Sequence, residues 1–192
     1  MVDEETARRA VVRTADELFY ARGVQAVGMD AVRTAAGVSL KRIYALFASK
    51  DELVAAVLRH RAEVWDTGLA AASERAATPR ERILVIFDFL DGWFREPSFR
   101  GCAFINMHGE LGSGSEAVAT AVREQKDRFQ RYVARLVAEA GAPPELAPQL
   151  AILAEGAQTT AAIAGTPDAA SHARAAAETL LDAAAVTTVR GA

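Results

Sequence analysis

The chain has 192 residues, of which 51% are hydrophobic and 24% charged, and its formal net charge at pH 7 is −3. This composition excludes a disordered or fibrous protein and provides enough apolar residues for a core in one or two small domains. Residues 1–62 carry ten Lys or Arg against eight Asp or Glu, whereas the rest of the chain carries 12 against 17. A basic N-terminal part on an acidic body suggests that only the N-terminal part meets a polyanion.

Alanine occurs in nearly every segment and stretches rich in β-branched residues are few, which predicts an almost entirely α-helical protein. Apolar spacing and capping residues predict about nine helices. They lie at about 5–22, 29–36, 39–47, 50–73 and 80–94, then one that opens near 100–106, one at about 115–140, one that starts near Pro144, and one at about 168–189. The fourth is expected to turn Leu53, Val57, Val64, Trp65 and Leu69 inward.

The chain shows no apolar signal segment at its start and no stretch that approaches the length of a membrane span. We therefore expect a cytoplasmic protein without membrane contact. The single cysteine, Cys102, excludes an intrachain disulfide and a cysteine-based metal cluster, and we expect it to be a buried, unreactive thiol.

The second and third predicted helices are short and joined by the sequence AAGVS at residues 35–39, a pattern typical of a helix-turn-helix. Gly37 allows the positive φ that such a sharp turn needs, and Ser39 is a good N-cap. The third helix turns Lys41, Arg42 and Tyr44 away from its apolar side. This outward face either enters a DNA major groove or is simply a solvated surface.

Residues 23–58 resemble the N-terminal DNA-binding domain of the TetR family of bacterial transcriptional repressors. The resemblance covers about residues 8–60 and rests on Phe19, Gly23, the run Ala36-Gly37-Val38-Ser39, Tyr44, Phe47, Ser49, Lys50 and Leu53. It implies a helix-turn-helix DNA-binding domain at residues 1–50 and a helical ligand-sensing and dimerisation domain at 51–192. Beyond residue 60 the resemblance fades.

The resemblance also implies roles for single residues. Tyr44 and Lys50 stand where the family usually contacts phosphates, which position the protein on DNA. Ser39, Leu40, Lys41 and Arg42 form the turn where base contacts are usual, with Arg42 suited to guanine and Leu40 to a thymine methyl.

Three features depart from the family pattern. Val27 and Gly28 replace the Thr-Ser pair that usually caps the second helix, so a phosphate-binding hydroxyl is missing. Lys41 stands where a Gly is common. Arg33 stands where a small residue is common, and either adds a cationic contact to DNA or is solvated.

The fifth predicted helix is apolar almost all round, so it should be central. Its aromatic residues form either plain core or the lining of a ligand cavity. For the cavity we predict Trp65, Phe87, Leu90, Trp93, Phe104, Met107, His108 and Phe129 as lining residues, with a largely apolar small molecule as effector. His108 would supply a polar contact, unless it lies at the surface or is satisfied in the core.

The seventh predicted helix carries arginines interleaved with acidic residues, which predicts a solvated, ion-paired face. The last two helices are rich in Ala and Gly, which allows close helix crossing. We expect them to form the interface of a homodimer, with Ala161 inside it and with Leu150, Leu153, Ile163, Leu180 and Leu181 as apolar anchors. Packing within one chain is the alternative.

The sequence contains no catalytic, phosphate-loop or dinucleotide motif, and its His and Glu pairs lack a third metal ligand. We expect no enzyme activity, no cofactor and no metal. The prediction is a transcriptional repressor that binds a near-palindromic double-stranded DNA operator and is released by its effector. The alternative is a small-molecule-binding helical protein, or an enzyme, without DNA-binding activity.

Overall fold

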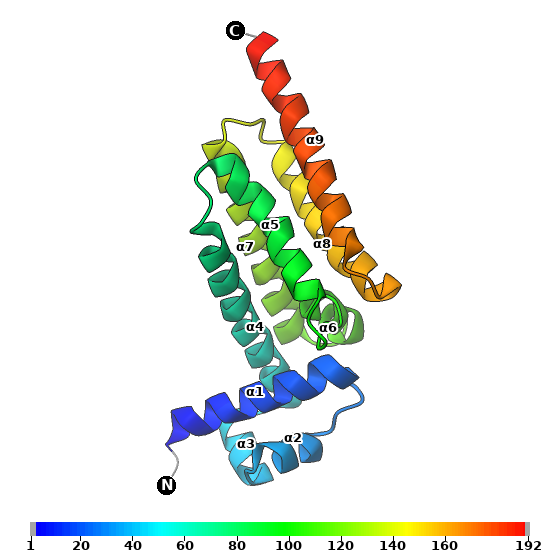
Figure 1. Ribbon diagram of the computed structural model, residues 1–192. Coiled ribbons are helices and arrows are strands. Elements are labelled where there is room, and N and C mark those ends of the chain that lie inside the picture. The colour runs from blue at the N-terminus through cyan, green and yellow to red at the C-terminus, as the bar shows by residue number, and fades with distance from the viewer. Residues whose placement is uncertain (1–2, 191–192) are drawn as a thin grey trace. The chain divides into compact units, whose positions relative to one another are not determined.

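The computed structural model describes residues 3–190 of the chain, and within them it contains nine helices and no strand (Figure 1). The helices are α1 (Glu4–Arg22), α2 (Met29–Ala36), α3 (Leu40–Leu46), α4 (Lys50–Ser73), α5 (Pro79–Phe94), α6 (Ala103–Leu111), α7 (Glu116–Glu139), α8 (Leu146–Ala164) and α9 (Asp168–Arg190). The all-α fold predicted from the sequence is confirmed.

Local capping explains why several helices begin and end where they do. Asp3 accepts a hydrogen bond from the backbone N–H of Thr6 and so caps α1. At α5, Thr78 and Glu81 form a reciprocal capping box, with Pro79 in the first turn. Gly165 ends α8 in the left-handed conformation, with φ +69°.

The contacts of the described residues separate the chain into two compact units. The first contains the described residues up to Val64 together with Ala103–Glu124, and the second contains Trp65–Cys102 and the residues from Gln125 onward. Helices α4 and α7 each contribute residues to both units. This division by contacts does not test the predicted boundary at residue 50 between a DNA-binding domain and a ligand-sensing domain, which stays a prediction.

In the first unit, α1 packs against both α2 and α3, and α2 packs against α3. The apolar side chains on the inner faces of these helices are buried: Val11, Ala15, Phe19, Val32, Ile43 and Leu46. Because α3 has its apolar residues on one side, the other side is left for contacts outside the unit.

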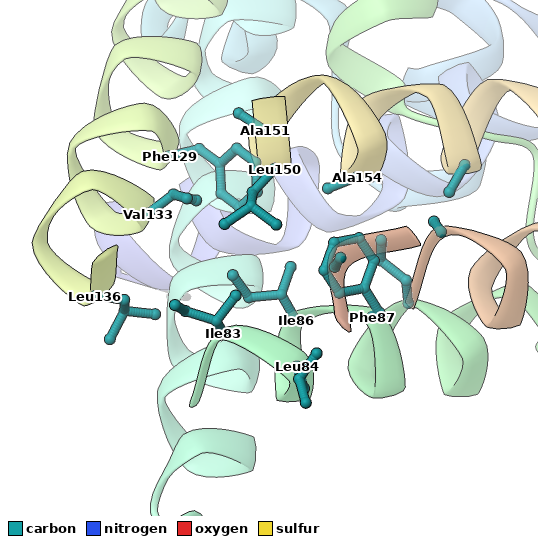
Figure 2. Close-up of a cluster of buried hydrophobic side chains, with 14 of the residues drawn as sticks. Ile83, Leu84, Ile86, Phe87, Phe129, Val133, Leu136, Leu150, Ala151 and Ala154 are labelled. Atoms are coloured by element: carbon teal, nitrogen blue, oxygen red, sulfur yellow. The ribbon is translucent and has the colours of Figure 1, made fainter. Parts of the chain in front are cut away.

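In the second unit, α5, α8 and α9 pack against one another. Figure 2 shows Ile83, Ile86 and Phe87 of α5 directed toward Leu150, Ala151 and Ala154 of α8, with Phe129 and Val133 of α7 beside them. The prediction that the fifth helix is central holds within this unit.

Two sequence-based expectations need correction. Val64 was expected to face inward, but it is largely exposed, because it lies two residues after the buried Ala62 and therefore on nearly the opposite side of α4. Ala161 is only 2% exposed within a single chain, where it belongs to the core of the second unit. A charged residue at position 161 would therefore disrupt the core of a single chain. Loss of the dimer in such a variant would not show that Ala161 lies in the dimer interface.

The burial of Cys102 is confirmed. Across the described helices, none combines the length and apolar character that crossing a bilayer requires.

Candidate nucleic-acid interface and ligand groove

The turn between α2 and α3 is built by Gly37 and Ser39. Gly37 has φ +67°, a conformation that costs a residue with a side chain more than it costs glycine, and its N–H bonds to the carbonyl of Arg33. The Ser39 hydroxyl accepts a hydrogen bond of 3.1 Å from the backbone N–H of Arg42. This bond caps α3 and fixes the direction in which its first turn projects.

The outward face of α3 is cationic. Lys41 is exposed, Arg42 is half-buried, and Tyr44 is 47% exposed. Neither Lys41 nor Arg42 forms a salt bridge with another described residue. Ile43 and Leu46 are buried on the opposite side and hold the helix in the unit.

Arg33 and Lys50 already have partners inside the first unit. The Nε of Arg33 lies 3.1 Å from Oδ1 of Asp30 in the same helix. The Nζ of Lys50 donates a 2.6 Å hydrogen bond to the carbonyl of Val24. An ammonium has three N–H donors, so Lys50 retains donors for a further acceptor.

The start of α2 has no side-chain cap. Gly28 is its N-cap residue and makes no side-chain hydrogen bond, and Val27 is buried. The hydroxyl cap that the family usually has at these two positions is therefore not replaced by another side chain.

Several contacts that brace this interface could not be read from sequence spacing. Arg8 donates a 2.6 Å hydrogen bond to the carbonyl of Leu46, at the end of α3, and its guanidinium lies 4.5 Å from the centroid of the Phe47 ring. Gln25 binds Glu110 of α6 through its backbone and its side chain. The partners lie 38 and 85 residues apart, so no local pattern connects them.

The aromatic residues predicted to line a cavity fall into both units. In the second unit, Trp65 contacts Phe89, Trp93 and Phe129 edge to face, with ring centroids 5.1, 5.5 and 6.1 Å apart. Phe87 and Leu90 are fully buried in the core of that unit. In the first unit, Phe104 and Met107 are buried, whereas His108 is exposed. Exposure of His108 is the alternative that the sequence left open.

An open groove with a volume of about 500 Å³ runs between α4 and α7 in the second unit. We call it the α4–α7 groove, and it is lined by Trp65, Asp66, Leu69, Ala70, Arg128, Phe129, Arg131, Tyr132 and Arg135. Only Trp65 and Phe129 of these were predicted as ligand residues. The sequence pattern missed the arginines because it assigned them to a solvated face.

The predicted ion pairing of α7 is present for three of its arginines. Arg123 pairs with Glu116 at 2.6 Å, Arg128 with Asp66 at 3.2 Å, and Arg135 with Glu139 at 3.7 Å. Within residues 3–190, no group of three or more His, Cys, Asp or Glu side chains is placed to hold a metal ion.

A glycine-centred turn, the Ser39 cap of α3 and the outward cationic face of α3 define α2 and α3 as a helix-turn-helix. Residues 11–57 match the family described as bacterial regulatory proteins, tetR family, and residues 79–177 match the tetracyclin repressor-like C-terminal domain. The chain belongs to the TetR family. This family consists of transcriptional regulators and not of enzymes.

Solved structures of similar fold cover nearly the whole chain. SCO4454, a TetR-family transcriptional regulator from Streptomyces coelicolor, is 26% identical, with a TM-score of 0.85 over 93% of this chain and 95% of that one. A putative TetR transcriptional regulator, sav143 from Streptomyces avermitilis, is 32% identical, with a TM-score of 0.81 over 93% and 97%.

Among curated proteins, the transcriptional activator FasR from Mycolicibacterium smegmatis is 34% identical over 88 residues, or 44% of this chain. The chain spans about 40% of the length of the curated relatives that it matches.

Proposed function

We propose that the protein binds operator DNA as a homodimer and represses transcription until a small molecule releases it. The observation that carries this proposal is the outward face of α3, where Lys41 and Arg42 form no ion pair with any residue that the structure describes. Cations left unpaired on a short, capped helix are suited to the phosphates and base edges of a major groove.

The contacts with DNA fall into two kinds. Arg42, Lys41 and Leu40 supply base contacts from the first turn of α3, with guanine O6 and N7 as acceptors for Arg42. Tyr44 and Lys50 contact phosphates and set the position of the protein. Ser39 acts mainly as the cap of α3, since its hydroxyl is already engaged. Arg33 contributes little, because Asp30 compensates its charge.

The dimer is formed by the last two helices. Ile152 and Ile163 of α8 are 70% and 83% exposed. With Gly156 and Thr159 they form an exposed stripe at positions i, i+4, i+7 and i+11, which is one face of a helix. Leu150 and Leu181 are buried inside the chain, and Leu153 and Leu180 are half-buried against its core. Of the five predicted anchors, Ile163 is therefore the most open to a partner. A two-fold dimer favours a near-palindromic operator.

The effector acts through α4, which runs unbroken from Lys50 to Ser73 and carries Trp65. A ligand that contacts Trp65 shifts the protein away from DNA only if it binds the DNA-incompetent state more tightly. A coupling of about 1–3 kcal/mol lowers operator affinity roughly 5- to 150-fold. The cytoplasm, where the DNA is, is the proposed location.

The test is selection of bound duplexes from a random double-stranded DNA pool, followed by affinity measurement on the enriched sequence. We expect a near-palindromic site. Arg42→Ala should lose about 1–3 kcal/mol on it and accept changes at one or two base pairs. Arg75→Ala removes an exposed arginine beyond the end of α4 and is the matched control. No enrichment by the folded parent would refute DNA binding and favour a ligand-binding protein without it.

A further inference from the structure

The α4–α7 groove has the size of a small-molecule site. Its volume of about 500 Å³ lies within the range of about 300–1,000 Å³ that is usual for ligand pockets. Its lining divides into an apolar part, formed by rings from both helices, and a charged part along α7. Both parts are needed to define the ligand.

The rings of the apolar part pack against neighbouring side chains without any ligand. Trp65 is half-buried and held edge to face by Phe89, Trp93 and Phe129. Tyr132 is fixed at its hydroxyl, 2.9 Å from the Oγ of Ser73. Rings that are already fixed offer a flat apolar surface at low cost in side-chain entropy, which favours a flat, aromatic ligand.

The hydrogen bonds of Ser73 decide what Tyr132 can offer. The Ser73 hydroxyl donates its proton to the carbonyl of Leu69 at 2.9 Å, so it accepts the proton of the Tyr132 hydroxyl. The donor of Tyr132 is therefore used within the protein. A negatively charged ligand group must accept hydrogen bonds from other residues of the groove.

Arg131 supplies those donors. The lining holds three arginines and a single acidic residue, Asp66, which pairs with Arg128. Arg135 pairs with Glu139. Arg131 lies between them in the sequence of α7, is exposed, and forms no salt bridge with a described residue. Its free guanidinium fork matches a carboxylate in a bidentate geometry.

We infer that the α4–α7 groove binds a small aromatic carboxylate, with its ring against Trp65 and Tyr132 and its carboxylate on Arg131. The inference deepens the proposed function and rests on it only where this ligand is taken to be the effector. A neutral apolar molecule would make no ionic contact with Arg131. The inferred ligand therefore differs from the largely apolar effector predicted from the sequence in carrying a negative charge.

The test uses 1-naphthaleneacetate and its neutral analogue 1-naphthaleneacetamide, which differ in charge at nearly equal size. Each is titrated into the full chain while the indole N–H signals of Trp65 and Trp93 are followed by NMR, with Trp93→Phe assigning the two. We expect the acid to shift the Trp65 signal and to bind about tenfold more tightly than the amide. Equal affinity, or no Trp65 shift at millimolar acid, would overturn the inference.

Arg131→Gln removes the proposed anchor at an exposed position, so folding should be unaffected. It should reduce the affinity for the acid to that for the amide and leave the amide unchanged. Arg75→Gln, at another exposed arginine outside the groove, should change neither. An Arg131→Gln variant that binds the acid like the parent would refute the carboxylate contact.

These titrations contain no DNA, so their outcome is independent of operator binding. A parent that binds the acid but retards no DNA would refute the proposed function and leave the groove assignment standing. A parent that binds DNA but not the acid would refute the groove assignment alone.

Discussion

Glu110 of α6 holds Gln25 of the α1–α2 connection at two points. The Gln25 backbone N–H donates a 2.9 Å hydrogen bond to the Glu110 carboxylate, and the Gln25 side-chain amide donates one of 2.9 Å to the Glu110 carbonyl. The same carboxylate lies over Gly23, where an added Cβ would come within 3.3 Å of it. One residue of α6 thus braces the segment that leads into the helix-turn-helix.

Glu110→Ala removes the charged acceptor and should lower the free energy of unfolding by about 1 kcal/mol, because the bond is exposed and partly replaced by water. Urea unfolding measures this. Glu63→Ala, at an exposed glutamate of α4, is the control and should change stability by less than about 0.5 kcal/mol. Equal effects of the two substitutions would show that the contact contributes nothing.

Lys50 has both a structural and a proposed DNA role, and two variants separate them. Lys50→Ala loses the bond to the Val24 carbonyl and the phosphate contact, whereas Lys50→Gln keeps a neutral donor. Both should weaken binding to all DNA sequences about equally and reduce the slope of log affinity against log salt by about 1. Only Lys50→Ala should also lose stability, by about 1 kcal/mol. An unchanged salt slope would exclude the phosphate contact.

Ile163→Glu tests the proposed dimer interface without touching the core, because Ile163 is exposed within the chain. A charge in the centre of an apolar interface should raise the dimer dissociation constant at least about tenfold, which sedimentation at low concentration can measure. Val64→Glu places the same charge at an exposed apolar position of α4 and should leave the dimer intact. If Ile163→Glu stays as dimeric as the parent, the interface lies elsewhere.

Asp16 and Arg61 form a largely buried ion pair between α1 and α4. Burial raises the pKa of the Asp16 carboxyl above its ordinary value of 3.8, although Arg61 and His60 act in the opposite direction. The folded state then takes up a proton at a higher pH than the unfolded state does. The contribution of Asp16 to stability should therefore grow as pH falls from neutral through the raised pKa toward 3.8.

Urea unfolding of the parent and of Asp16→Asn across this pH range tests the sign. The free energy of unfolding of the parent should rise relative to that of the variant as pH falls. A difference that shrinks with falling pH would show that the ion pair, and not burial, controls this carboxyl.

Gln125 and Gln158 are both buried glutamines, at 5% and 4% exposure, but they differ in hydrogen bonding. The Oε1 atom of Gln125 has no partner among the described residues, whereas Gln158 donates to the carbonyl of Ala154 at 3.2 Å. Gln125→Leu removes an unsatisfied polar atom and should raise the free energy of unfolding by about 1 kcal/mol. Gln158→Leu should give no such gain. Thermal or urea unfolding compares them, and destabilisation by Gln125→Leu would contradict the prediction.

The sequence by itself determined the helices and the helix-turn-helix, because their signals are local. Ser39 and Thr78 cap the helices that follow them, Gly37 and Gly165 end the helices before them, and apolar spacing sets the buried face of each. Such signals act within one or two helical turns, so they can be read without knowing the tertiary structure.

The tertiary structure alone decided which side chains meet and which surfaces stay open. Ala161 is buried and Ile163 exposed on the same alanine-rich helix, because α8 packs against α9 and α5 on one side only. Asp66 neutralises Arg128 across 62 residues of sequence, while Arg131 has no acidic partner in the described part of the chain. Pairings between distant segments depend on how helices pack, so the charge that defines the α4–α7 groove became visible only in the folded chain.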